Sequence, residues 1–372
     1  MSLWRKWKMK FRRMAWDLAK RNDTVYVAFL SSGGVGDLVV NMNFIAAFKK
    51  HCEAAGGRLE IDLFHSAKLV ESLYDREEGY LSGWYDLAEY REKLEGKYDL
   101  VFSLRMRSPK PFSCRFRRVS TICPEALRLR RLYAAHCDAH ADFIDQHPRW
   151  DGLYGQLMAA RGYTRLQEAD IDHVFGIEDF SIRIPVRDEE KTLHAFGLKA
   201  GAYLTFNNSV DTTFEGSRST KQWFSRSFEA LFALIHEKRP DLKLVYLGPT
   251  REDVLAPYVC NLSGKTTFEE LKVLLKNAKL HVGPEGGMVH MRRAMGAENG
   301  GKSCVLFGPT TPDVFGYAEN INLEDASACP ARCEWMTSDW QMRCACGKLP
   351  ECRKMRALTP EKVFEAIEGE LR

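Results

Sequence analysis

A glutamate, two glycines and a histidine stand close together in the chain, at Glu285, Gly286, Gly287 and His290. They follow a short apolar run, residues 280–282, which is typical of a buried strand that ends at a turn. Because glycine lacks a β-carbon, the backbone amides that open the next helix can approach a ligand closely, and that helix end attracts negative charge. This stretch therefore predicts a phosphate site. The alternative is a tight strand-to-helix turn that binds nothing.

The neighbouring sequence supplies the elements that must position these groups. Residues 288–295 have the pattern of a helix that closes at Gly296, and residues 303–307 form a second buried run before a Gly-Pro-Thr-Thr-Pro loop. A strand, a glycine turn, a helix and a second strand make half of a nucleotide-binding α/β layer. In such layers, ligands bind outside the carboxyl ends of the strands.

A second unit of this kind opens the chain. Residues 25–30 are rich in strand-forming side chains, residues 31–36 form a glycine-rich loop, and Asp37 precedes a helix-like run over 38–49. The arrangement is Rossmann-like, although the spacing is not that of the dinucleotide fingerprint. Asp37 either caps this helix or takes part in chemistry.

These residues resemble glycosyltransferase family 9, whose best-known members are ADP-heptose–lipopolysaccharide heptosyltransferases. The family has an acidic residue, a small-residue turn, a histidine in the following helix, a strand that ends in FGPT and a P-x-x-x-G-Y-like segment. In this chain the motif corresponds to Glu285, Gly286-Gly287, His290, 307–310 and 312–317. The family more often has Asp at the position of Glu285. The resemblance implies an α/β protein of GT-B architecture, in which two Rossmann-like domains face a central cleft.

The resemblance also implies roles for individual residues. Asp37, in a Gly-Asp pair, would be the catalytic base, and Lys221, in a Lys-x-Trp segment, would stabilise the departing diphosphate of the donor. Glu252 would bind the ribose and Glu285 the sugar hydroxyls. The alternatives are a solvated lysine at 221 and a carboxylate at 252 that only favours a helix start. The remaining predicted donor contacts are Gly286, Gly287, His290, Ser219 and Thr220.

The implied activity is inverting transfer of a heptose or related sugar from an ADP-sugar to a hydroxyl of lipopolysaccharide core or another cell-surface glycan. One alternative is a protein O-heptosyltransferase of the same fold. Another is a sugar-nucleotide-binding scaffold without catalysis. No cofactor is expected at the catalytic centre, because Lys221 and the amides of the glycine turn carry the charge that a metal would otherwise neutralise.

Length and composition agree with this architecture. The 372 residues are enough for two domains of about 150 to 200 residues each. We expect a basic amphipathic helix over 1–24, an acceptor domain over 25–198 and a donor domain over 199–372, with the boundary near Lys199. No apolar run approaches the roughly 20 residues that span a bilayer, and we expect a cytoplasmic protein.

Basic residues gather in two places. Residues 2–21 hold eight Lys or Arg and one acid, and a helix there has an apolar face of Trp4, Trp7, Phe11, Met14 and Leu18. This helix either lies at the inner face of the cytoplasmic membrane or packs across the protein or a partner subunit. The arginine-rich stretch 105–131 predicts a groove for an anionic glycolipid acceptor, or else solvated surface. With a net charge of only +4 and no recognised binding motif, nucleic acid is not expected as a partner.

The chain has eleven cysteines and no secretory leader, which favours a reducing compartment. Five of them fall in the tail 329–352. Four thiolates satisfy a tetrahedral zinc site, so we expect Cys329, Cys333, Cys352 and either Cys344 or Cys346 to hold a structural zinc or iron. The alternatives are reduced surface thiols or disulfides. Many family 9 members have a cysteine-rich tail here, and those that modify autotransporter proteins have a metal-bound cysteine finger.

Overall fold

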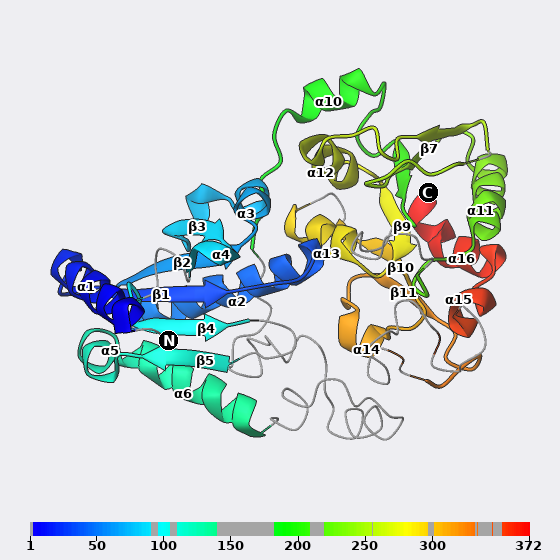
Figure 1. Ribbon diagram of the computed structural model, residues 1–372. Coiled ribbons are helices and arrows are strands. Elements are labelled where there is room, and N and C mark those ends of the chain that lie inside the picture. The colour runs from blue at the N-terminus through cyan, green and yellow to red at the C-terminus, as the bar shows by residue number, and fades with distance from the viewer. Residues whose placement is uncertain are drawn as a thin grey trace. The chain divides into compact units, whose positions relative to one another are not determined.

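The computed structural model describes residues 3–90, 96–104, 110–139, 182–208, 219–254, 256–296, 301–331, 333, 344 and 352–372. The chain divides into two compact units, and within the described residues the division falls between Arg183 and Ile184. Each unit is a sheet with helices packed against it (Figure 1). This confirms the predicted α/β class.

The first unit is built on a five-stranded sheet of order β3-β2-β1-β4-β5. The first four strands are parallel, and β5 runs antiparallel to β4 at the edge. The strands are β1 (Val25–Leu30), β2 (Leu59–His65), β3 (Gly83–Asp86), β4 (Leu100–Ser103) and β5 (Lys110–Cys114). The helices are α1 (Leu3–Ala19), α2 (Val35–Ala54), α3 (Ala67–Leu73), α4 (Leu87–Glu89), α5 (Phe116–Ile122) and α6 (Pro124–Ala139), with a 3-10 turn over Arg76–Glu78.

Strand β1 is the centre of this unit because all six of its side chains are buried. Phe29 packs against Phe44 and Phe48 of α2 and stacks on Phe102 of β4, with ring centroids 4.9 Å apart in the last pair. Val27 pairs with Ile61 of β2 on one side and Leu100 of β4 on the other. An unbroken apolar run is what a parallel strand covered on both faces requires.

A buried carboxylate ties the N-terminal helix to this sheet. Asp99 is fully buried just before β4 and accepts hydrogen bonds from the backbone N–H of Tyr26 at 3.0 Å, Lys20 Nζ at 2.8 Å and Arg118 Nε at 3.1 Å. Burial lowers the pKa of Lys20, and the hydrogen bond to Asp99 opposes that shift. The charges are therefore compensated, as a buried ion requires.

The second unit has a six-stranded, fully parallel sheet of order β11-β10-β9-β6-β7-β8. Its strands are β6 (Tyr203–Phe206), β7 (Lys243–Tyr246), β8 (Val259–Asn261), β9 (Leu280–Pro284), β10 (Ser303–Phe307) and β11 (Ile321–Glu324). Its helices are α10 (Glu189–Ala195), α11 (Ser225–Lys238), α12 (Phe268–Lys276), α13 (Gly287–Ala294), α14 (Pro312–Phe315), α15 (Arg353–Ala357) and α16 (Pro360–Ile367), with a 3-10 turn over Glu368–Leu371.

One core of this unit joins the end of the chain to the sheet. Trp223 is fully buried, packs edge-on against Phe228 of α11, and donates its indole N–H to the carbonyl of Leu358 at 2.9 Å. Strand β9 also contains a buried histidine: His281 Nδ1 lies 3.1 Å from Thr205 Oγ1 of β6. Burial lowers the pKa of His281 to about 3, so the ring is neutral in the folded protein near neutral pH.

Helix α13 is held by a buried arginine. Arg292 is fully buried and donates to the carbonyls of Ala278 at 2.8 Å and Lys302 at 3.0 Å, and also to that of Leu275 at the end of α12. The last carbonyls of a helix have no partner within it, so this guanidinium satisfies groups that would otherwise be buried unpaired. It also fixes α13 against α12 and β10.

The segment between the two units differs from the sequence expectation. Residues 182–185, in this segment, form no strand. Ile182 N donates to Asn43 Oδ1 at 2.7 Å, and Ile184 N donates to the carbonyl of Ala294 at 2.8 Å. The division between units lies earlier than the boundary expected near Lys199, because α10 belongs with the second unit through Glu189, which pairs with Lys276.

We predict that replacing Arg292 by Met lowers the free energy of unfolding of the second unit by about 3 to 5 kcal/mol, because several buried carbonyls lose their donor while the volume is kept. Urea denaturation followed by circular dichroism measures the change. Arg226→Met, an exposed arginine on α11, is the matched control and should shift stability by no more than about 0.5 kcal/mol. Equal denaturation midpoints for the two variants would contradict the role of Arg292.

Candidate functional site

In the first unit, the strand order reverses at β1. The chain passes from β1 to β2 and β3 on one side, and then returns to β4 on the other. Ligands of open α/β sheets bind outside the carboxyl ends of the strands at such a switch point. The loop that leaves the carboxyl end of β1 is the glycine-rich segment 31–36, which leads into α2 and Asp37.

Asp37 lies in the first turn of α2, half-buried, and its Oδ2 accepts a hydrogen bond from the backbone N–H of Gly34 at 2.9 Å. The capping alternative is thus realised, and it also orients the carboxylate. Gly33 has φ +120°, and a β-carbon there would lie 2.5 Å from Asp37 Oδ2. Glycine at 33 is therefore required for both the backbone conformation and the close approach of the carboxylate.

The second sheet reverses between β6 and β9. From β6 the chain builds β7 and β8 on one side, then crosses to β9, β10 and β11 on the other. Lys221 lies between β6 and α11, and Glu285 directly follows β9. The two predicted donor residues therefore come from the two strands that flank this switch point, which is where a ligand of this sheet is expected.

Lys221 and Glu285 form an ion pair, with Lys221 Nζ donating to Glu285 Oε2. The lysine side chain is 14% exposed and the glutamate side chain 3% exposed, so both charges are largely withdrawn from water. The two side chains, predicted to bind the diphosphate and the sugar respectively, thus contact each other. A lysine in this position is not the solvated side chain of the alternative interpretation.

The glycine turn places the amino end of α13 beside this pair. Gly286 is the N-cap residue of α13, and Gly287 is its first residue. Gly286 has φ 168°, which is extended backbone, and a β-carbon there would meet no atom within 4 Å. The space beside Gly286 is therefore open, and the predicted close approach of a ligand to these amides stays a prediction. The first amides of a helix nevertheless lack intrahelical partners and favour an anion.

His290 extends the ion pair into a chain of polar groups. Its Nε2 faces Glu285 Oε1 at 3.7 Å, longer than a hydrogen bond, and its Nδ1 lies 2.6 Å from the hydroxyl of Tyr317. A carboxylate only accepts, so the proton of the neutral imidazole belongs on Nε2, and Nδ1 then accepts from the tyrosine O–H. Glu285 thus favours the tautomer of His290 with the proton on Nε2, and Tyr317 holds the ring through Nδ1. Both side chains are buried.

The segment that carries Lys221 is fixed by its neighbours. The side chains of Ser219 and Thr220 are buried, and Ser219 Oγ accepts from the backbone N–H of Lys221 at 3.2 Å. On the other side, Asn208 Oδ1 accepts from the backbone N–H of Trp223 at 2.8 Å. Ser219 is thus shown to shape the turn, while its predicted contact with phosphate stays a prediction, as does that of Thr220.

Glu252 follows β7 at the same edge of the sheet. Its Oε2 accepts a hydrogen bond from the hydroxyl of Tyr246 at 2.7 Å, and its carbonyl accepts from Asn261 Nδ2 at 2.7 Å. Burial, reinforced by the Glu252 carboxylate, raises the pKa of Tyr246 above its ordinary value. No helix begins within residues 251–254, so the alternative role as a helix-start acid is wrong.

The basic stretch 105–131 is in part structural. Arg115 pairs with Asp17 of α1, and Arg118 donates to the buried carboxylate of Asp99. Arg128 pairs with Glu125 one turn away. Arg115 and Arg118 thus join elements of the first unit, whereas Arg128 forms an exposed pair within α6; the acceptor groove stays a prediction. Arg105 and Arg107 lie outside the described residues.

The tail cysteines that the structure describes are buried, namely Cys329, Cys333, Cys344 and Cys352. Neither a disulfide nor a group of three or more metal-ligating side chains is formed among the described residues, and Cys346 lies outside them. Burial raises the pKa of Cys352, the N-cap residue of α15, and the nearby Cys344 adds to the rise. The alternative of surface thiols is wrong for these four.

Two functional groups were missed by the sequence analysis. Tyr317 stands only at the end of the family motif, and Tyr246 is not among the predicted site residues. A Gly-Tyr pair after a proline-rich loop was the available signal for Tyr317, but its contact with a helix 27 residues earlier has no local pattern. In the sequence, Tyr246 looks like an ordinary aromatic residue at the end of a strand, with no sign of a functional role.

Comparisons with known proteins address the fold and the family. Residues 171–342 match the model of glycosyltransferase family 9 (heptosyltransferase). A comparison with curated protein sequences found no match. Among solved structures, ADP-heptose lps heptosyltransferase II of E. coli shares 13% identity over 93% of this chain and 98% of that chain, with a TM-score of 0.54. The family 9 glycosyltransferase of Veillonella parvula DSM 2008 shares 16% over 93% and 97%, with a TM-score of 0.56.

A third similar structure is TibC of enterotoxigenic E. coli H10407, an iron-containing dodecameric glycosyltransferase, at 11% identity over 94% of this chain and 76% of that chain, with a TM-score of 0.58. TibC is also known in complex with ADP-D-beta-D-heptose. At these identities the structures show the fold alone. The chain therefore has the GT-B fold, and its residues 171–342 are similar to glycosyltransferase family 9.

Proposed function

We propose that this glycosyltransferase moves a heptose from ADP-heptose to a hydroxyl of an anionic glycan acceptor such as lipopolysaccharide core, with inversion at the anomeric carbon. The observation that carries the proposal is the chain Lys221, Glu285, His290 and Tyr317 at the switch point of the second sheet, beside the amino end of α13. It combines a cation and helix amides for a diphosphate with a carboxylate for sugar hydroxyls. The complex of TibC with ADP-D-beta-D-heptose supports this donor.

In the proposed reaction, the Asp37 carboxylate takes the proton of the acceptor hydroxyl while that oxygen bonds to the anomeric carbon. The bond from that carbon to the ADP oxygen breaks at the same time, and ADP leaves with the electron pair. Lys221 and the amides of Gly286 and Gly287 stabilise the negative charge of the departing diphosphate. Glu252 accepts hydrogen bonds from the ribose, for which Tyr246 orients its carboxylate.

The ion pair gives Lys221 a partner before the donor arrives. Without Glu285, a cation this far from water would be destabilised, since burial without a counter-charge is costly. When a diphosphate binds, Lys221 gains a second anion within reach, and Glu285 becomes available to sugar hydroxyls. The same two side chains would thus serve the diphosphate and the sugar that are joined in the donor.

The donor and the base are tested in one experiment. ADP-heptose should raise the melting temperature of the wild-type protein more than UDP or GDP sugars do, because only a bound donor stabilises the folded state by mass action. Asp37→Asn keeps an oxygen for the Gly34 N–H, so it should keep this shift while kcat falls by about 10² to 10⁴-fold. ADP release measures turnover.

Wild-type turnover in a folded Asp37→Asn protein would contradict the base assignment. A shift with ADP-heptose but no ADP release by the wild-type protein with any acceptor would support the scaffold alternative instead.

We predict that Tyr317 acts through His290. Tyr317→Phe removes only the hydroxyl that donates to His290 Nδ1, and kcat/KM for ADP-heptose should fall about tenfold, the effect of roughly 1.4 kcal/mol. In a His290→Phe background, the same change should have almost no further effect, because the partner is already gone. Tyr258→Phe, a partly exposed tyrosine, is the control. If the two losses in kcat/KM multiply in the double variant, the two side chains act independently, which would contradict the prediction.

A second candidate function is O-heptosylation of a protein acceptor, favoured by the four buried cysteines of the tail and by the similarity to iron-containing TibC. We propose that Cys329, Cys333, Cys352 and either Cys344 or Cys346 hold a structural zinc or iron, although the described residues alone do not form a three-ligand group. When deprotonated, thiolates are the preferred ligands of both metals. Lipopolysaccharide core and an autotransporter passenger domain, assayed side by side, distinguish the two acceptors.

Metal analysis tests the tail directly. Anaerobically purified protein should contain about one equivalent of zinc or iron, and Cys352→Ser should lower that content because one ligand is lost. Cys304→Ser, a buried cysteine in β10 outside the tail, is the control. A metal content below about a tenth of an equivalent in the wild-type protein would end the claim.

A further inference from the structure

Helix α1 presents a stripe of large apolar side chains to solvent. Trp7 is 58% exposed, Phe11 63%, Met14 54% and Leu18 88%, and these four residues define the apolar stripe. Their spacing of three and four residues places them on one face of the helix. The rings of Trp7 and Phe11 lie 6.1 Å apart, and the other exposed large hydrophobic side chains of the described residues, Phe116, Leu132 and Tyr258, lie elsewhere in the chain. Contiguous exposed apolar patches mark interaction sites.

The opposite side of α1 is fixed to the first unit, so the helix cannot turn its stripe inward. Lys20, just after the helix, donates to the buried carboxylate of Asp99 at 2.8 Å. Asp17 pairs with Arg115, and Lys97 Nζ lies 5.8 Å from the ring centroid of Trp16. Helix α1 is thus held on its inner side by contacts that leave the apolar stripe outside.

The charge of helix α1 indicates which kind of partner covers the apolar stripe. The helix sequence LWRKWKMKFRRMAWDLA contains six Lys or Arg and one acid, and that acid, Asp17, is already paired with Arg115. Two copies of such a helix would bring like charges together, which opposes self-association. An anionic lipid surface attracts each cation and accepts the apolar stripe among its acyl chains. Tryptophan also favours the boundary between headgroups and acyl chains.

We propose that α1 docks the protein on an anionic lipid bilayer, with the apolar stripe inserted and the cations at the headgroups. The helix lies in the interface rather than across it: none of the helices among the described residues has the length and apolar character needed to span a membrane. This inference does not depend on the proposed donor or acceptor.

The position of α1 in the first unit suits this role. Lys20 and Asp99, which anchor it, lie before the amino ends of β1 and β4, whereas Asp37 follows the carboxyl end of β1. Figure 1 shows α1 beside the amino end of β1, with the strand leading away from it. Docking through α1 therefore leaves the carboxyl edge of this sheet, where Asp37 lies, away from the bilayer surface.

The test is co-sedimentation of the full chain with vesicles of phosphatidylglycerol and phosphatidylcholine in equal parts, and with phosphatidylcholine alone. Wild-type protein should pellet with the anionic vesicles and be released by high salt, because salt screens the attraction. Phe11→Ser/Leu18→Ser should lower the bound-to-free ratio by about tenfold or more, since two apolar side chains no longer insert. Its melting temperature should stay unchanged, because both side chains are exposed in the folded protein.

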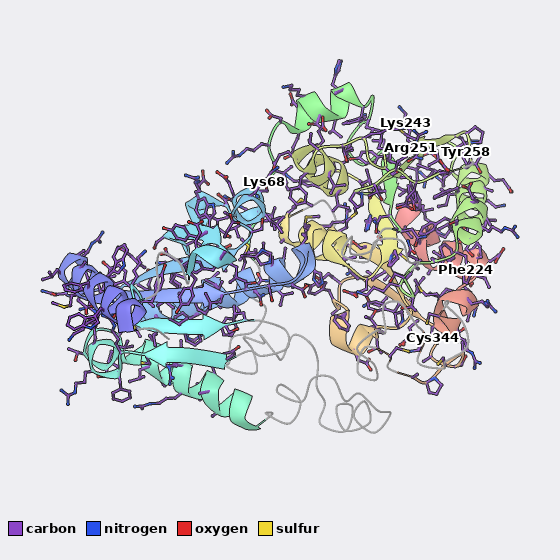
Figure 2. All side chains as sticks on the ribbon, viewed as in Figure 1. Lys68, Phe224, Lys243, Arg251, Tyr258 and Cys344 are labelled. Atoms are coloured by element: carbon purple, nitrogen blue, oxygen red, sulfur yellow. The ribbon has the colours of Figure 1, made fainter. Side chains whose placement is uncertain are left out.

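Tyr258→Ser, which changes an exposed aromatic residue of the second unit, is the matched control and should sediment as the wild type does (Figure 2). Equal sedimentation of the double variant and the wild type would overturn the proposal, as would binding to neutral vesicles that matches binding to anionic ones. A wild-type dimer that becomes monomeric in the double variant would show that a second copy covers the stripe, and would also overturn it.

Discussion

The buried ion pair between Lys221 and Glu285 is the interaction on which the candidate site depends. It joins the segment after β6 to the turn after β9, so it fixes the two loops that leave the switch point of the second sheet. Neither charge is stable alone at this level of burial, because a partner's removal leaves an uncompensated ion. The pair therefore explains how the side chain of Lys221 is held in position beside the amino end of α13.

The rest of the second unit keeps this pair in place through a few long-range polar contacts. Arg292 fixes the far end of α13 by binding carbonyls at the end of α12 and before β10, and the indole of Trp223 binds the backbone at Leu358. These side chains are buried and bonded to main-chain groups, which cannot move without moving a strand or a helix. The ion pair is thus flanked by two rigid contacts: that of Trp223 on the side of Lys221, and that of Arg292 on the side of Glu285.

The local sequence pattern predicted the positions of strands and helices well. It did not predict which side chains contact one another. Strands β1 and β10 have the predicted bounds, and α13 lies within one residue of its prediction, because burial on both faces leaves an unbroken apolar run and glycine marks the turns. Strand β5 was missed, since Pro111 and the surrounding cations argue against a strand, although an edge tolerates both. The roles of Arg115, Arg118, Arg292 and Tyr317 were beyond prediction, because each partner is remote in sequence and periodicity carries no information about such contacts.

The two sheets share a topological feature that the motifs alone did not show. In each sheet the chain reverses direction beside its first strand, β1 in one unit and β6 in the other. The connections that follow these first strands lead to Asp37, in the first turn of α2, and to Lys221, while Glu285 directly follows β9, across the second reversal. At a reversal, the connections on either side diverge, so backbone and side chains at the carboxyl ends remain accessible to a ligand. The residues proposed for catalysis thus occupy the position in each sheet at which the fold itself favours binding.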